Sequence, residues 1–152
     1  MMGSRRTLLG LVLATILASA AVEAAETTLR LTVPKSVAAH AARWAAGDST
    51  AVPPILVLEG LELTLDERLE ITVLGPPPAG GGPAEVLAVT GMVGSPHATP
   101  KPPLQKITMP VPLNEAAAKL LADRSEITLT LQVTGRRGRP PLKFDRAFFR
   151  EP

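Results

Sequence analysis

The stretch EITLTLQVT, from Glu126 to Thr134, decides the fold of this chain. Apolar side chains occupy every second position from Ile127 to Val133, and threonine or glutamine fills the positions between them. A period of two is the pattern of a β-strand with one buried and one wet face. The same alternation occurs at residues 28–33 and 69–73. The sequence therefore predicts three half-buried strands in widely separated parts of the chain.

Further strand-like patterns at residues 55–63, 86–92, 105–109 and 142–149 bring the expected total to about seven short strands. Proline- and glycine-rich turns separate them. The clearest turn, GPPPAGGGP at residues 75–83, cannot form regular structure, because proline lacks an N–H donor and glycine lacks conformational restraint. Short strands joined by such turns are typical of antiparallel sheets. We predict an all-β fold, an antiparallel and jelly-roll-like β-sandwich with one short helix.

The short helix is predicted at residues 115–122, within LNEAAAKLLAD. Asn114 is a good N-cap, because its side-chain oxygen can accept a hydrogen bond from a free N–H group of the first turn. Ala118 and Leu121 would then share one face that covers an end of the sandwich. A second segment, SVAAHAARWAA at residues 36–46, also has helical composition and a candidate cap in Ser36.

The first 24 residues have the anatomy of a signal peptide. Arg5 and Arg6 precede an apolar run at residues 8–18, and small residues follow up to Ala25. Cleavage is expected after Ala24, with cleavage after Ala21 or Ala25 as the alternatives. SRRTLL at residues 4–9 fits the twin-arginine pattern, and an ordinary secretory signal explains the two arginines equally well. We expect an exported protein, periplasmic or secreted, with one domain at residues 25–152 and no membrane attachment after cleavage.

Charge and cysteine content exclude some classes of protein. The formal charge of the whole chain is +2, and loss of Arg5, Arg6 and Glu23 with the signal peptide would reduce it to +1. Nucleic-acid binding calls for a clustered basic surface, so we do not expect a nucleic-acid partner. The chain has no cysteine, which leaves burial and hydrogen bonding to hold the fold without disulfides.

Two further segments occur in the same order as in one known module: ILVLEGLEL at residues 55–63 and VTGMVGSPH at residues 89–97. The helix and the strand described above follow them, again in the order of that module. This order resembles the C-terminal domain of the polyphenol oxidases, the catechol oxidase and tyrosinase family. The counterparts of that domain are residues 55–66, 69–74, 90–97, 113–123 and 126–136. The KFDV signature of the plant domain is replaced by EITV at residues 70–73, and KFD at residues 143–145 lies in the last predicted strand. Residues 36–46 fall where plant members carry a long charged loop, so we expect a loop with a helical turn there.

The resemblance implies a protein without chemistry of its own. A dicopper centre needs two sets of imidazole ligands, and the chain has only His40 and His97. Carboxylates are paired in Asp66-Glu67 and in Glu59 with Glu62, yet neither pair has a nearby nucleophile or base, so we expect no catalytic residue.

In the family, this domain covers the dicopper site, and a bulky side chain from it fills the substrate entrance. The resemblance therefore implies a shielding, copper-loading or export partner of a dicopper oxidase, with copper held by the partner and no cofactor bound directly. The alternative is an exported β-sandwich for binding or adhesion with no oxidase partner, because a fold does not fix a function.

Several residues are candidates for contact with copper or a partner. His97 could handle copper on its loop, or its ring could simply fix a turn, because a lone histidine makes a poor metal site. Trp44 lies four residues after His40 and is either a docking anchor or a hydrophobic anchor of its own segment. Phe144 and Phe148 are expected in the core and Phe149 on the opposite, exposed face. The remaining docking candidates are Met92 and the basic residues Arg136, Arg137 and Arg139. The three arginines form either a clamp for an acidic partner or a solvated hairpin tip. The candidates for the bulky side chain that would fill the substrate entrance of the oxidase are Met92, Met109 and Phe149.

Overall fold

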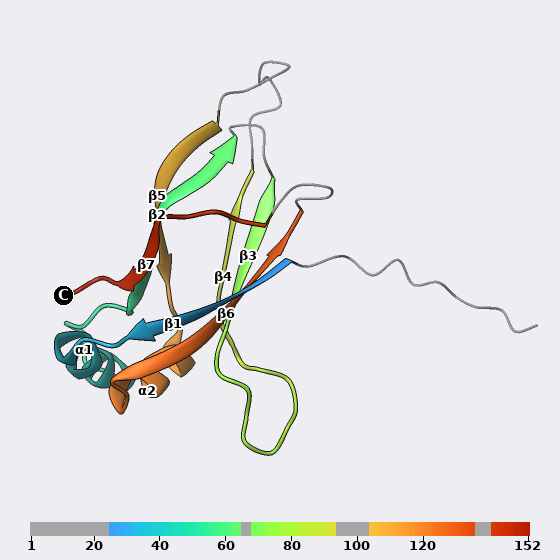
Figure 1. Cartoon of the computed structure of the whole chain (residues 1–152). Helices are drawn as coiled ribbons and strands as arrows, with labels where there is room; N and C mark the ends of the chain where they lie inside the picture. The colour runs from blue at the N-terminus through green and yellow to red at the C-terminus, as the bar shows by residue number, and fades with distance from the viewer. Residues whose placement is uncertain (1–24, 65–67, 94–103, 136–140) are drawn as a thin grey trace, which may run out of the picture.

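A computed structural model describes residues 25–64, 68–93, 104–135 and 141–152. These residues form two antiparallel sheets and two helices (Figure 1), so the predicted all-β sandwich is confirmed. The four-stranded sheet has the order β1-β6-β3-β4, and the three-stranded sheet has the order β5-β2-β7. The elements are β1 (Ala25–Thr32), α1 (Lys35–Ala45), β2 (Ile55–Thr64), β3 (Leu69–Leu74), β4 (Val86–Met92), β5 (Leu104–Pro112), α2 (Glu115–Ala122), β6 (Glu126–Thr134) and β7 (Arg146–Phe149).

β6 lies inside the four-stranded sheet, with β1 on one side and β3 on the other. Leu29 of β1 stands opposite Leu129, and Val73 of β3 stands opposite Leu131. The apolar positions of the sequence alternation are the buried ones, and Leu131 and Val73 are fully buried. The inner faces of both sheets and one face of each helix contribute to one continuous core. The alternation of EITLTLQVT therefore determines which face of the sheet is buried.

β2 is interrupted by a bulge between Leu58 and Leu61, where its register with β5 shifts. Gly60 in this bulge has a φ of 72°, a conformation that glycine adopts without a steric penalty. The segment before β7 comes against the bulge: Asp145 N donates to Glu59 O at 2.8 Å, and Glu62 N donates to Lys143 O at 2.9 Å. The Asp145 side chain occupies the space that a Cβ at position 60 would need. Only glycine fits this close approach without a rearrangement.

The prediction of a loop at residues 36–46 was wrong, because residues Lys35–Ala45 form the helix α1. Its N-cap is Pro34, without a side-chain hydrogen bond, so the Ser36 cap was also wrong. The helix is rich in alanine, the best helix former, and it buries Val37 and Ala41. It packs against α2 at the same end of the sandwich (Figure 1). Tertiary packing therefore stabilises a helix that has no capping side chain.

α2 begins and ends where the sequence predicted, at Glu115–Ala122 after the N-cap Asn114. Asn114 also connects this helix to β4. Its Oδ1 accepts from Ala117 N at 3.0 Å, and its Nδ2 donates to Val86 O at 2.8 Å. Its backbone N donates to Leu87 O at 2.9 Å. One side chain thus satisfies an orphan donor of the helix and an outward carbonyl of the sheet.

Changing Asn114 should separate these two roles. Asn114→Ala should lower the free energy of unfolding by about 1–2 kcal/mol, because both side-chain hydrogen bonds are lost. Asn114→Ser should cost about half as much, because serine keeps the cap acceptor but cannot also reach Val86 O. Urea denaturation measures both values. Equal losses in the two variants would mean that the cap contributes nothing.

The connection between β3 and β4 is an exposed loop, as the sequence predicted for residues 75–83. Gly81 and Gly82 in it have φ values of 73° and 120°. In the part of the chain that the structure describes, no helix is long and apolar enough to cross a membrane.

Candidate functional site

The outer face of the three-stranded sheet carries apolar side chains on all three strands. Val57 of β2 stands between Pro110 of β5 and Phe148 of β7, and Ile55 stands opposite Pro112. Side chains directly opposite one another project from the same face of a sheet. We call Ile55, Val57, Pro110, Pro112 and Phe148 the outer apolar patch. Val57 is only 3% exposed although it lies outside the core cluster, which shows how closely its neighbours cover it.

A charged group lies beside this patch on the same face. Arg146 lies over the ring of Phe148, with its guanidinium carbon 4.6 Å from the ring centroid. The same guanidinium donates to Glu59 Oε2 from Nε at 3.0 Å and from Nη2 at 2.8 Å. A cation over an aromatic face is attracted by the ring quadrupole. The half-buried Phe148 is therefore held in one orientation at the border of the patch.

Further from α1, the same face becomes polar. Lys106 Nζ lies 3.1 Å from Asp145 Oδ1, and the hydrogen bond to this carboxylate raises the pKa of Lys106. Glu62 stands opposite Lys106 in the sheet. The outer face thus divides into an apolar half and a half with paired charges, in which Leu104 of β5 is also 59% exposed. Such a division is what a docking surface with an apolar centre and a polar rim requires.

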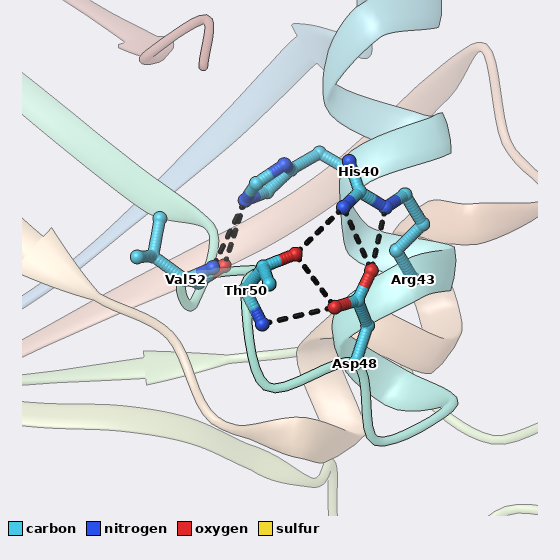
Figure 2. Close-up of polar contacts among 5 residues, drawn as sticks. All are labelled: His40, Arg43, Asp48, Thr50 and Val52. Atoms are coloured by element: carbon cyan, nitrogen blue, oxygen red, sulfur yellow. Dashed lines mark hydrogen bonds and ion pairs between the residues drawn. The ribbon is translucent and has the colours of Figure 1, made fainter.

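A network of polar side chains stabilises the turn after α1 (Figure 2). Arg43 Nε donates to Asp48 Oδ2 at 2.8 Å, and the backbone N and the hydroxyl of Thr50 donate to Asp48 Oδ1 at 2.9 and 2.7 Å. The hydrogen bonds from Thr50, followed by the one from Arg43, lower the pKa of Asp48 to about 2. The carboxylate therefore stays ionised and keeps its partners well into the acidic range.

His40 fixes the next part of the same connection. Its Nε2 atom lies 3.1 Å from both the N and the O of Val52 (Figure 2). A ring with a free Nε2 accepts from Val52 N–H, whereas a ring protonated at Nε2 donates to Val52 O. The histidine thus has a backbone partner in either state. Its role here is to hold the segment that leads into β2.

A small pocket opens between this connection and the residues after β7. Its volume is about 40 Å³, and it is lined by Val37, His40, Val52, Pro53, Pro54, Ile55, Arg150, Glu151 and Pro152. A volume of this size has room for a few water molecules. Ile55 belongs both to the pocket and to the outer apolar patch, so the two form one continuous surface. This geometry favours contact with another macromolecule over enclosure of a small organic ligand.

The exposed position predicted for Phe149 was wrong. Phe149 is 3% exposed and stands opposite the fully buried Leu56, on the inner face. Phe148 was predicted in the core and instead lies in the outer apolar patch, whereas Phe144 packs against the core as predicted. The reason is that β7 begins only at Arg146, so the alternation of faces does not extend back to Phe144.

The other candidates are less accessible than a docking anchor should be, or lie outside the described residues. Met109 is 8% exposed and belongs to the core. Trp44 and Met92 are partly buried and pack against the core. His97 and the basic residues Arg136, Arg137 and Arg139 lie outside the described residues, as does the pair Asp66-Glu67. The described residues contain no group of three or more histidine, cysteine or acidic side chains that could hold a metal ion.

Sequence reasoning missed the pairing of Phe148 with Arg146 and Glu59. The signal available was KFDRAFF, in which an arginine precedes an aromatic residue by two positions and so shares its face in a strand. No protein-family model matches the chain, and no curated protein matches it significantly.

Proposed function

We propose that this chain is an exported accessory protein without catalytic residues that docks on a dicopper polyphenol oxidase and shields or helps to load its copper site. The observation that carries the proposal is the order of segments. The described parts of the stretches that resemble the oxidase C-terminal domain fall in β2, β3, the end of β4, α2 and β6, in that order along the chain. Copper would be held by the partner, because the two histidines of this chain cannot supply two sets of imidazole ligands.

The outer apolar patch is the surface that best fits such a contact. Binding energy at protein interfaces concentrates in a few residues, among which aromatic residues and arginine are enriched. Phe148 and Arg146 combine the two kinds, and Arg146 is already oriented by Glu59. Because Phe148 is held in place before binding, little side-chain entropy is lost when a partner covers it. Phe148 therefore takes the role of docking anchor that the sequence had suggested for Phe149.

The test is to mix the purified protein with a dicopper oxidase from the same host that lacks its own C-terminal domain. We expect a specific complex and a change in catechol oxidation or in copper content of the oxidase. Phe148→Ala should weaken binding about 30-fold, which corresponds to about 2 kcal/mol. Calorimetric titration measures the affinity, and thermal melts show that the variant is folded.

Thr128→Ala is the matched control, because Thr128 is exposed on the outer face of the other sheet. This variant should bind like the parent protein. The protein alone, with added copper, should show no catechol oxidation. If no oxidase of the host binds, the oxidase proposal fails and the partnerless binding or adhesion module becomes the better hypothesis. If the oxidase binds but Phe148→Ala binds as tightly as the parent, only the assignment of the surface is wrong.

A further inference from the structure

Among the described residues, β4 is an edge strand of the four-stranded sheet and pairs with β3 alone. An edge strand presents unpaired N–H and C=O groups, which can recruit a strand from another molecule. Natural proteins protect such edges with charged side chains, prolines or very short strands. The question for each edge of this protein is therefore which of these devices it carries.

The other three edges are protected. β1 carries Glu26 and Arg30, both exposed. β5 carries Lys106 and the prolines Pro110 and Pro112, which have no N–H to donate. β7 is only four residues long and begins with the exposed Arg146. In an intermolecular sheet, each of these strands would place a charge at the interface, lack an N–H donor or form too few hydrogen bonds.

β4 has none of these devices. Its sequence, VLAVTGM, contains no charge and no proline. Val86 is 46% exposed and Val89 59% exposed, and Val93, directly after the strand, is 82% exposed. Among the described residues, three of the five exposed large hydrophobic side chains therefore lie on β4 or next to it. Exposed apolar side chains gather at the one edge that lacks protection.

Part of this edge is already occupied. Leu87 O accepts from Asn114 N, and Val86 O accepts from Asn114 Nδ2, so the start of β4 is closed by the residue that caps α2. As far as the described residues show, the stretch left for a new partner is residues 88–92. Its midpoint is Thr90.

We propose that β4 is a self-association site, at which the β4 strands of two copies of this chain pair antiparallel about a two-fold axis centred on Thr90. This register sets Ala88 against Met92 and Val89 against Gly91 of the other copy. Val89 then lies beside a residue without a side chain, which leaves room for it. Because β4 is uncharged, no like charges meet, and the two-fold closes the assembly at two copies.

This pairing joins two four-stranded sheets into one continuous sheet. A single pair of short strands buries less surface than a standard interface, so we expect a weak dimer that dissociates in the micromolar range or above. The inference does not depend on the oxidase proposal, because the outer apolar patch lies on the other sheet. Failure of either proposal leaves the other standing.

The first experiment uses the absence of cysteine in the chain. Thr90→Cys should form a disulfide-linked dimer under mild oxidation, because the two side chains stand opposite each other across the axis. Thr28→Cys, on the protected edge β1, is the matched control and should stay monomeric. Non-reducing gel electrophoresis separates the outcomes. Equal cross-linking of the two variants, or none in Thr90→Cys, would overturn the proposal.

The second experiment needs no new bond. Val89→Lys should raise the dissociation constant of the dimer at least tenfold, because two lysines would face the same interface, and it should leave the melting temperature unchanged since Val89 is exposed. Thr28→Lys should dimerise like the parent. Sedimentation velocity over a range of concentrations measures both. A parent protein that stays monomeric throughout, including one whose β4 pairs only with a different protein, contradicts self-association.

Discussion

Phe149→Ala is expected to lower the free energy of unfolding by about 3–5 kcal/mol, the range for a large aromatic side chain removed from a core. The side chain is 3% exposed and stands opposite Leu56, which is fully buried. Its loss would leave a cavity at the edge of the three-stranded sheet, in a strand of four residues that has little other burial to hold it. Urea denaturation followed by circular dichroism gives the value.

Phe148→Ala is the control one position away. Phe148 is half-buried on the outer face, so its truncation should cost about 1 kcal/mol, through the lost contact with Arg146 and the uncovering of Val57. The two variants together test which face of β7 is inside. If Phe148→Ala destabilises the protein as much as Phe149→Ala, the assignment of the two faces is wrong.

The second large effect is expected at the bulge of β2. Gly60→Ala should lower the free energy of unfolding by about 2–4 kcal/mol, because a left-handed φ costs a residue with a Cβ about 1–2 kcal/mol and the new methyl group meets the Asp145 side chain. Gly47 offers a matched control. Its φ is 85°, and a Cβ there would meet nothing within 4 Å. Gly47→Ala should therefore report the backbone cost alone.

A double-mutant cycle isolates the steric part. Asp145→Ala by itself should change stability by less than about 1 kcal/mol, because the ion pair with Lys106 that it removes is exposed. In the double variant Gly60→Ala/Asp145→Ala, the two closest contacts, with Oδ2 and Cγ of Asp145, are removed and only the Cβ contact at 2.9 Å remains. The combined loss should therefore be at least about 1 kcal/mol smaller than the sum of the single losses. Strict additivity would show that Asp145 is not the obstacle.

Much of the fold could be predicted because local pattern and tertiary burial agree. The alternation at residues 126–134 reports directly on burial, and Asn114 caps α2 at the predicted position. α1 could not be placed in the same way. It lacks a capping side chain, and what holds it is contact with α2, about seventy positions further along the chain.

The face of β7 could not be predicted for a different reason. Alternation divides a strand into two faces but does not say which face is inside. The neighbouring β2 gives no help, because Leu56 on the inner face and Val57 on the outer face are both apolar and both buried. The sequence therefore suggested Phe149 as the docking anchor, whereas the neighbouring Phe148 lies on the accessible face and Phe149 lies in the core.

The pairing of β1 with β6, in which Leu29 stands opposite Leu129, has a kinetic consequence. The first described strand cannot join its sheet until most of the chain is present, since four of the other strands, β2 to β5, lie between the two partners in the sequence. Contacts over such separations must overcome a large loop-closure entropy before they contribute stability, and folds dominated by them form in milliseconds to seconds. During synthesis β1 emerges before the other described strands, and its apolar side chains Leu29 and Leu31 stay uncovered until β6 is available. The rate at which this protein matures should therefore depend on when its last quarter arrives, and the interval before that is the period in which the chain is most prone to aggregate.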